Sequence, residues 1–293
     1  MGVALLFPGQ GSQAVGMGRV LYETHPEVQG LFERAEQVTR LPLRQLMFEG
    51  PVEALQRTSV TQPALYLHGY ALFRVKGFSP AAVAGHSLGE FTALAVAGVF
   101  SFEEGLELVR VRAEAMQAAC DAQPSTMAAI IGLADETVES LCQEVKEGVV
   151  VPANYNSPGQ LVVSGEVPAI EAVIEKAKAA GARLAKKLSV NGAFHSPLME
   201  PARQKLAAAI EKASFHKPTC LVYPNVTAAA EQDPERLRSL LIQQLTAPVR
   251  WAQTLRAMWA DGMRQFYELG PGNVLAGLVR RTLPEAFVES HDS

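Results

Sequence analysis

A single serine lies between two glycines in the segment GHSLG, residues 85–89. The apolar stretch 80–86 predicts a strand before it, and the Ala-rich stretch 89–100 predicts a buried helix after it. GxSxG between a strand and a helix is typical of a nucleophile elbow, a sharp turn that exposes the serine hydroxyl. The pattern indicates that Ser87 is a nucleophile, and the alternative is a glycine-rich turn with an incidental serine.

A nucleophilic serine needs donors for the oxyanion of its tetrahedral intermediate. The N–H of Leu88 lies at the N-terminus of the predicted helix, directly before residue 89, and is the closest candidate. The loop GQGSQA, residues 9–14, follows a strand predicted over 3–7 and can bring the N–H of Gln10 to face the elbow. The same loop matches GxGxxA and permits a dinucleotide site with Glu33 as ribose contact. We disfavour that alternative because Pro8 interrupts the junction and a nicotinamide site leaves the elbow unexplained.

The serine also needs a base, and the chain has six histidines. His195, in VNGAFHSPLMEP, is our candidate general base, although a core histidine would look similar. His86 is expected to point away from Ser87, because neighbours on a strand alternate faces, and to serve in packing. The other four look structural or incidental: His25, His68, His216 and His291.

The composition indicates an ordinary globular protein. The 293 residues are 48% hydrophobic and carry a net charge of −4, which does not point to nucleic acid or to an anionic membrane. The N-terminal apolar stretch is too short for a signal peptide, and no apolar run approaches the ~18 residues of a membrane helix. Three widely spaced cysteines without a CxxC pair favour reduced thiols over disulfides or zinc. We therefore expect a cytoplasmic protein without a metal.

The order of strand-like and helix-like stretches predicts an α/β protein with an insertion. Residues 127–190 have the order βαββαβ, which is typical of a ferredoxin-like unit. We expect a large subdomain, 1–126 and 191–293, and a small subdomain, 127–190. The cleft between them is a natural ligand site.

The predicted helix 103–120 carries two arginines that are candidates for binding a carboxylate. Its apolar stripe is expected to be buried, and Arg110 and Arg112 flank this stripe on opposite sides, about 200° apart on the helix. Helical periodicity does not choose between them. The stripe consists of Leu106, Val109, Ala113, Met116 and Cys120.

Eight motifs in one order connect the chain to a known family. The sequence resembles the malonyl-CoA:acyl-carrier-protein transacylases and the related acyltransferase domains of fatty-acid and polyketide synthases, over nearly its whole length. The motifs are PGQGSQ (8–13), TQPAL (61–65), GHSLGEFTAL (85–94), RVR (110–112), NSPGQLVVSG (156–165), GAFHSPLM (192–199), PVRW (248–251) and ELGPGNVL (268–275).

The resemblance implies a fold and a site. The fold would be an α/β-hydrolase-like large subdomain with an inserted ferredoxin-like small subdomain. GAFH (192–195) resembles the form found in malonyl-selective members, with a phenyl ring beside the substrate α-carbon. The implied site residues are Ser87 (nucleophile), His195 (base), Gln244 (main-chain carbonyl to His195), Gln10 and Leu88 (oxyanion hole), Arg112 (carboxylate clamp) and Phe194 (acyl selectivity).

The implied reaction is ping-pong transfer of a malonyl group from malonyl-CoA to the phosphopantetheine thiol of a holo acyl carrier protein. It needs no metal or cofactor, serves fatty-acid or polyketide synthesis, and is carried out by a monomer. The carrier, typically acidic in this family, is expected to meet basic residues, which are Lys186, Lys187, Arg280 and Arg281.

Two other classes of function remain alternatives. A serine hydrolase, either a thioesterase or an esterase, normally shows an HGGG-type motif and an acid before a late histidine, and neither is evident. An inactive docking module is expected to lack Ser87 or His195, and both are present.

Overall fold

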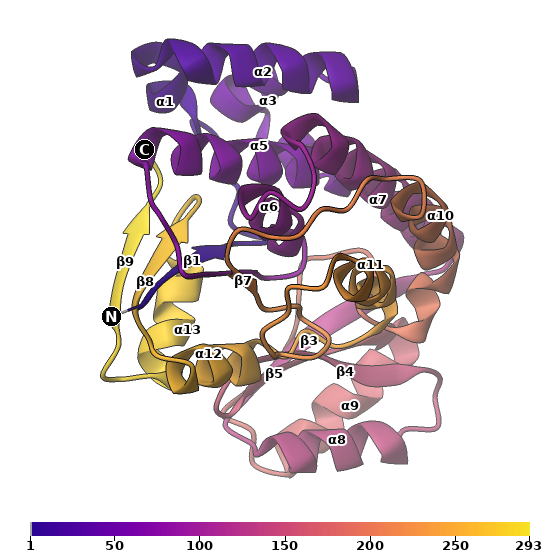
Figure 1. Cartoon of the computed structure of the whole chain (residues 1–293). Coiled ribbons are helices and arrows are strands. Elements are labelled where there is room, and N and C mark those ends of the chain that lie inside the picture. The colour runs from indigo at the N-terminus through magenta and orange to yellow at the C-terminus, as the bar shows by residue number, and fades with distance from the viewer. Residues whose placement is uncertain (1) are drawn as a thin grey trace.

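The computed structural model describes residues 2–293, which form two sheets with helices packed around them (Figure 1). The larger sheet has five strands, all parallel to their neighbours. Ser87 follows its second strand in spatial order. The order across the sheet is β7 (Leu221–Val222), β2 (Ala82–Gly85), β1 (Gly2–Phe7), β8 (Met263–Leu269) and β9 (Phe287–His291).

Helices cover both faces of this sheet, as a parallel sheet requires. Along β1, Leu5 and Phe7 belong to one apolar core, and Ala4 and Leu6 belong to the other. Helices α12 (Trp251–Ala260) and α13 (Val274–Thr282) cover the second face. The helices on the first side are α1 (Arg19–Thr24), α2 (Pro26–Thr39), α3 (Leu43–Glu49), α4 (Val52–Leu55), α5 (Thr58–Lys76), α6 (Gly89–Val96), α7 (Phe102–Ala122), α10 (Glu200–Ile210) and α11 (Pro234–Gln243).

The smaller sheet is antiparallel and has the strand order of a ferredoxin-like unit, which confirms the predicted fold class. Ala128 and Ile130 face helices α8 (Asp135–Glu144) and α9 (Val167–Ala179), whereas Met127 and Val162 belong to the core of the larger body. The order is β4 (Val150–Ser157), β5 (Gln160–Glu166), β3 (Ser125–Ile131) and β6 (Leu184–Lys187).

Several element ends differ from the sequence predictions. The strand predicted over 80–86 is only Ala82–Gly85, and the helix predicted over 89–100 ends at Val96. Gly98 lies just beyond it with a φ of 77°, a left-handed conformation that stops a helix. The loop 9–14 opens no helix, since α1 begins at Arg19, so the helix N-terminus required by a dinucleotide site is missing there.

Two single-turn 3₁₀-helices, η1 (Pro197–Met199) and η2 (Gln244–Thr246), complete the secondary structure around the elbow. Within residues 2–293, no helix has both the length and the apolar character needed to cross a bilayer.

Candidate active site

Ser87 lies at the turn between β2 and α6 and has a left-handed φ of 53°. A Cβ at Gly85 would overlap the backbone of Gly89, and a Cβ at Gly89 would overlap the carbonyl group of Phe7. Asn225 clamps the turn, because its Oδ1 accepts from the Ser87 N–H (2.8 Å) and its Nδ2 donates to the Gly85 carbonyl (2.7 Å). The turn has the strained and closely packed geometry of a nucleophile elbow.

His195 presents its imidazole ring to Ser87. Its Nε2 lies 2.7 Å from Ser87 Oγ, and its Nδ1 lies 2.9 Å from the main-chain oxygen of Gln244 and 3.1 Å from that of Ala247. Carbonyl oxygens only accept hydrogen bonds, so the proton of the neutral ring belongs on Nδ1 and Nε2 accepts from the Ser87 hydroxyl. Burial and then the charge of Arg112 lower the pKa of His195 to about 3. The ring is therefore neutral at pH 7, with Nε2 unprotonated.

Arg112 brings a buried positive charge to the same hydroxyl. Its side chain is 1% exposed, and its Nη2 donates to Ser87 Oγ (3.0 Å) and to Gln244 Oε1 (3.1 Å). Its Nη1 donates to Gln62 Oε1 (2.7 Å). Burial lowers the pKa of Arg112 to about 9, which leaves the guanidinium protonated at pH 7. Within residues 2–293 it forms no ion pair, and its Nε–H has no partner, so its charge is available to an anion.

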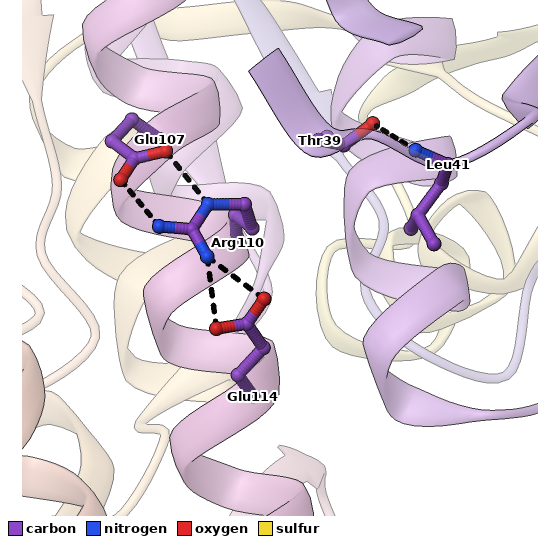
Figure 2. Close-up of polar contacts among 5 residues, drawn as sticks. All are labelled: Thr39, Leu41, Glu107, Arg110 and Glu114. Carbon is purple, nitrogen blue, oxygen red and sulfur yellow. Dashed lines mark hydrogen bonds and ion pairs between the residues drawn. The ribbon is translucent and has the colours of Figure 1, made fainter. Parts of the chain in front are cut away.

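Arg110, the alternative on the same helix, lies on the opposite, solvent-facing side. Figure 2 shows its guanidinium between the carboxylates of Glu107 and Glu114, with hydrogen bonds of 2.6 to 2.9 Å. Its charge is satisfied on the surface of α7. Of the two arginines, only Arg112 contacts Ser87.

A cavity of about 230 Å³ opens beside Ser87, between the two sheets. Gln10 and Leu88 line it, and within residues 2–293 the main-chain N–H of neither donates to another protein group. Two unpaired N–H groups next to a nucleophile can stabilise an oxyanion. Apolar side chains of both subdomains form other parts of the wall, which are Met116, Met127, Val162, Val190, Leu275 and Leu278.

Phe194 also lines this cavity, directly before His195 in the chain, and is 8% exposed. It also lines a second, more polar cavity, together with Thr58 and Asn191. Phe194 therefore borders both spaces, and a smaller side chain at this position would enlarge the volume beside Ser87.

His86 does not simply pack, as its strand position suggested. It lines the same cavity as Ser87, and its Nε2 lies 2.8 Å from Asn156 Oδ1 on β4. Burial lowers the pKa of His86, and Trp251 packs against its ring at 5.4 Å between centroids. The N–H of His86 still bonds to Phe7 of β1, and the chain leaves the strand conformation at Ser87, so strand alternation does not relate the directions of these two side chains.

Sequence reasoning missed three polar residues around the elbow: Gln62, Glu90 and Asn225. Gln62 lies within the TQPAL motif and binds Arg112. Glu90 is the only charged residue of α6, and it is 2% exposed. A carboxyl group in an otherwise apolar helix is a signal that could have identified it. Asn225 follows the two-residue strand β7, which sequence patterns do not reveal.

The cysteine side chains of the described residues lie apart from the site around Ser87, since no cysteine lines its cavity. No three His, Cys, Asp or Glu side chains among residues 2–293 are grouped as metal ligands. Burial raises the pKa of the Cys120 and Cys220 thiols to about 11 and that of Cys142 to about 12, so all three are poor nucleophiles.

Comparison with known sequences identifies relatives of this chain. A family model described as "Acyl transferase domain" matches residues 4–291. The malonyl CoA-acyl carrier protein transacylase of Escherichia coli (strain K12) is 43% identical over 283 residues, which cover 95% of this chain and 92% of the relative. That of Bacillus subtilis (strain 168) is 40% identical over 284 residues, 95% of this chain and 90% of the relative.

Solved structures agree with the sequence matches. The malonyl CoA-acyl carrier protein transacylase of Coxiella burnetii superimposes with a TM-score of 0.96 at 39% identity, covering 99% of this chain and 93% of that one. A malonyl-transacylase in complex with its type II PKS acyl-carrier protein has a TM-score of 0.96 at 40% identity, covering 100% and 96%. The chain belongs to the acyl transferase family, among the malonyl-CoA:acyl carrier protein transacylases.

Proposed function

We propose that this chain transfers the malonyl group of malonyl-CoA to the phosphopantetheine thiol of a holo acyl carrier protein, through a malonyl ester on Ser87. The names of its relatives support this reaction, in fatty-acid or polyketide synthesis. One observation carries the mechanism. Ser87 Oγ lies within hydrogen-bond distance of both a neutral imidazole, His195 Nε2 (2.7 Å), and a buried guanidinium, Arg112 Nη2 (3.0 Å).

In the first half-reaction, the Ser87 oxygen attacks the thioester carbonyl carbon while its proton passes to His195 Nε2. The N–H groups of Gln10 and Leu88 stabilise the resulting oxyanion. The C–S bond then breaks, and the proton moves from His195 to the CoA thiolate. The product is a malonyl ester on Ser87, and His195 is neutral again.

In the second half-reaction, the carrier's thiol gives its proton to His195 and its sulfur attacks the ester carbon. The C–Oγ bond breaks, and Ser87 recovers the proton from His195. Every bond and proton is accounted for by these two residues and the two thiols, so the proposal includes no cofactor. The main-chain oxygen of Gln244 holds the His195 ring in the required tautomer.

Recognition of the acyl group follows from the charge of Arg112. A guanidinium that is buried and lacks an ion-pair partner in residues 2–293 is stabilised by a carboxylate. An acetyl group leaves this charge unpaired, which costs binding free energy. The proposal therefore includes discrimination for malonyl over acetyl.

Intact-mass measurement tests the proposal directly. The wild-type protein, mixed with malonyl-CoA, is expected to gain one malonyl group, which a holo acyl carrier protein then removes and carries. Ser87→Ala is expected to abolish labelling while thermal unfolding stays normal, because only the hydroxyl is lost. His195→Ala is expected to slow labelling by about three powers of ten or more, as removal of a triad base does.

Other outcomes would contradict the proposal. Prompt release of free malonate without transfer to the carrier would support a serine hydrolase. Absence of any adduct on a folded wild-type protein would support a docking module. Light scattering of the same sample tests the expected monomer.

A further inference from the structure

Glu90 is a buried carboxyl group that the proposed mechanism does not use. It lies in the first turn of α6, three residues after Ser87, with 2% of its surface exposed. A carboxyl group in such a place must find hydrogen-bond donors, because burial without them is costly. Two donors meet at its Oε2, which accepts from Gln244 Nε2 (2.9 Å) and from the main-chain N–H of Asn225 (2.9 Å).

Gln244 links this carboxyl group to His195, Ser87 and Arg112. Its main-chain oxygen lies against His195 Nδ1 (2.9 Å), and its Nε2 also donates to the main-chain oxygen of Ser87 (2.9 Å). Its Oε1 accepts from Arg112 Nη2 (3.1 Å). The side chain of Gln244 therefore stands between Glu90 and the guanidinium.

The orientation of the Gln244 amide matters for Arg112. With Oε1 toward Arg112, the amide accepts from the guanidinium, and with the amide reversed its NH₂ group would face a donor that cannot accept. Two acceptors select the first orientation, because Oε2 of Glu90 and the main-chain oxygen of Ser87 both bind the NH₂ group; of the two, only that of Glu90 belongs to a side chain. The order of contacts is thus Glu90, Gln244, Arg112 and the Ser87 hydroxyl.

We propose that Glu90 is a positioning residue for acyl selectivity, which acts by fixing the Gln244 amide so that Arg112 is held beside Ser87. This inference rests on the proposed function. It assigns to Glu90 the role of an acceptor, and the neutral carboxyl group retains an acceptor oxygen. Burial raises the pKa of Glu90 to about 7, so the charge of this group varies near neutral pH while the acceptor persists.

The second donor to Glu90, the main-chain N–H of Asn225, is expected to affect the rate of transfer in a way that does not depend on the acyl group. Asn225 clamps the elbow through the Ser87 N–H and the Gly85 carbonyl, and its own N–H depends on Glu90 Oε2. Loss of this bond is expected to slow transfer of every acyl group equally. The malonyl-to-acetyl ratio of kcat/KM therefore isolates the path through Gln244.

The test compares kcat/KM for malonyl-CoA and acetyl-CoA in Glu90→Leu and Glu90→Gln. Glu90→Leu removes the acceptor and is expected to lower the malonyl-to-acetyl ratio about tenfold, the effect of one lost hydrogen bond in a charged network. Glu90→Gln keeps an acceptor of the same shape and is expected to stay within about threefold of wild type. This rescue would not follow from a role of the carboxylate charge.

Gln244→Met provides the second variant, because it removes the amide but keeps the main-chain oxygen against His195. It is expected to lower the malonyl-to-acetyl ratio as Glu90→Leu does. The double variant is expected to have the same ratio as Gln244→Met alone, since Glu90 acts through Gln244. Circular dichroism and thermal unfolding identify any variant that does not fold.

The proposal is overturned if folded Glu90→Leu retains the wild-type ratio, or if both acyl groups lose activity equally. If Glu90→Leu does not fold, an unchanged ratio in Gln244→Met overturns it. Failure of the proposed function is a separate result, because wild-type protein would then form no malonyl adduct at Ser87.

Discussion

The Ser87 hydroxyl lies between the imidazole of His195 and the guanidinium of Arg112. The first accepts its proton, and the second donates a hydrogen bond to its oxygen. The same positive charge lowers the pKa of His195, in addition to the larger effect of burial. A carboxylate that pairs with Arg112 reduces this effect and strengthens His195 as a base. In the proposed mechanism, binding of a malonyl group would thus favour proton transfer as well as recognition.

Arg112 and Arg110 form a matched pair for testing the carboxylate clamp. Arg112→Ala is expected to lower kcat/KM for malonyl-CoA by about a hundredfold and to favour acetyl-CoA relatively, because a buried charge-assisted contact is lost. Arg110→Ala is expected to change neither, since it removes only ion pairs at the surface of α7. Both are measured with the two thioesters and one holo carrier. A normal malonyl preference in Arg112→Ala would disprove the clamp.

Phe194 is expected to exclude a methyl branch on the acyl α-carbon. Phe194→Ser enlarges the cavity beside Ser87 and is expected to reduce discrimination against methylmalonyl-CoA by roughly tenfold, the effect of one methylene in a tight pocket. Phe194→Leu provides an apolar control that is expected to have a smaller effect. The kcat/KM values for malonyl-CoA and methylmalonyl-CoA give the ratio. An unchanged ratio in Phe194→Ser would make Phe194 a packing residue only.

The sequence was most informative where a short motif is typical of one local structure. GxSxG between an apolar strand and a helix predicted the turn at Ser87, which the structure has. It was least informative where burial depends on distant segments. Periodicity could not choose between Arg110 and Arg112, because the choice depends on α5 and η2, which supply Gln62 and Gln244.

At the scale of the elements, the order of helices and strands could be predicted from the sequence, but the residues at which they begin and end could not. The βαββαβ order of the smaller sheet was read from alternating and helical apolar patterns, and the sheet has that topology. The end of α6 at Val96 depends on the local turn around Gly98. The strand β7 has only two residues, too few for a pattern, yet it precedes Asn225, which clamps the elbow.

Two helical glycines test how tightly α6 and α13 are packed. Gly89→Ala is expected to destabilise the protein by about 3 kcal/mol or more, because the new Cβ would overlap the Phe7 carbonyl group of β1. Gly277→Ala in α13 is expected to stabilise it by about 0.5–1 kcal/mol, since no atom beyond the adjacent residues and the backbone of α13 itself lies within 4 Å of the new Cβ and alanine favours the helix. Denaturant unfolding measures both. A destabilised Gly277→Ala would mean that α13 needs the glycine for another reason.

At the scale of the whole molecule, the segment 244–249 connects the smaller sheet to His195. Val249 pairs with β4 through its N–H to Ala153 (2.8 Å) and its carbonyl to Tyr155 (2.9 Å). The same segment begins at Gln244, whose main-chain oxygen faces His195. The segment that contacts His195 is therefore hydrogen-bonded to the smaller sheet. The subdomain boundaries, 127 and 190, stay a prediction, and limited proteolysis tests them.

We predict that an acidic carrier protein docks beside the cavity, at Arg281. Arg281 is exposed on α13 and donates to Gln160 (2.7 Å), which lines the cavity, so its charge lies beside the cavity wall. Arg281→Glu is expected to slow transfer from preformed malonyl-enzyme to the carrier by about tenfold at low salt, because the new charge repels an acidic partner. Transfer to free pantetheine, a neutral thiol, is expected to remain normal. Lys212→Glu, at an exposed site away from the cavity, is the control. Equal slowing with carrier and pantetheine would place Arg281 in the thiol's path and not in a docking surface.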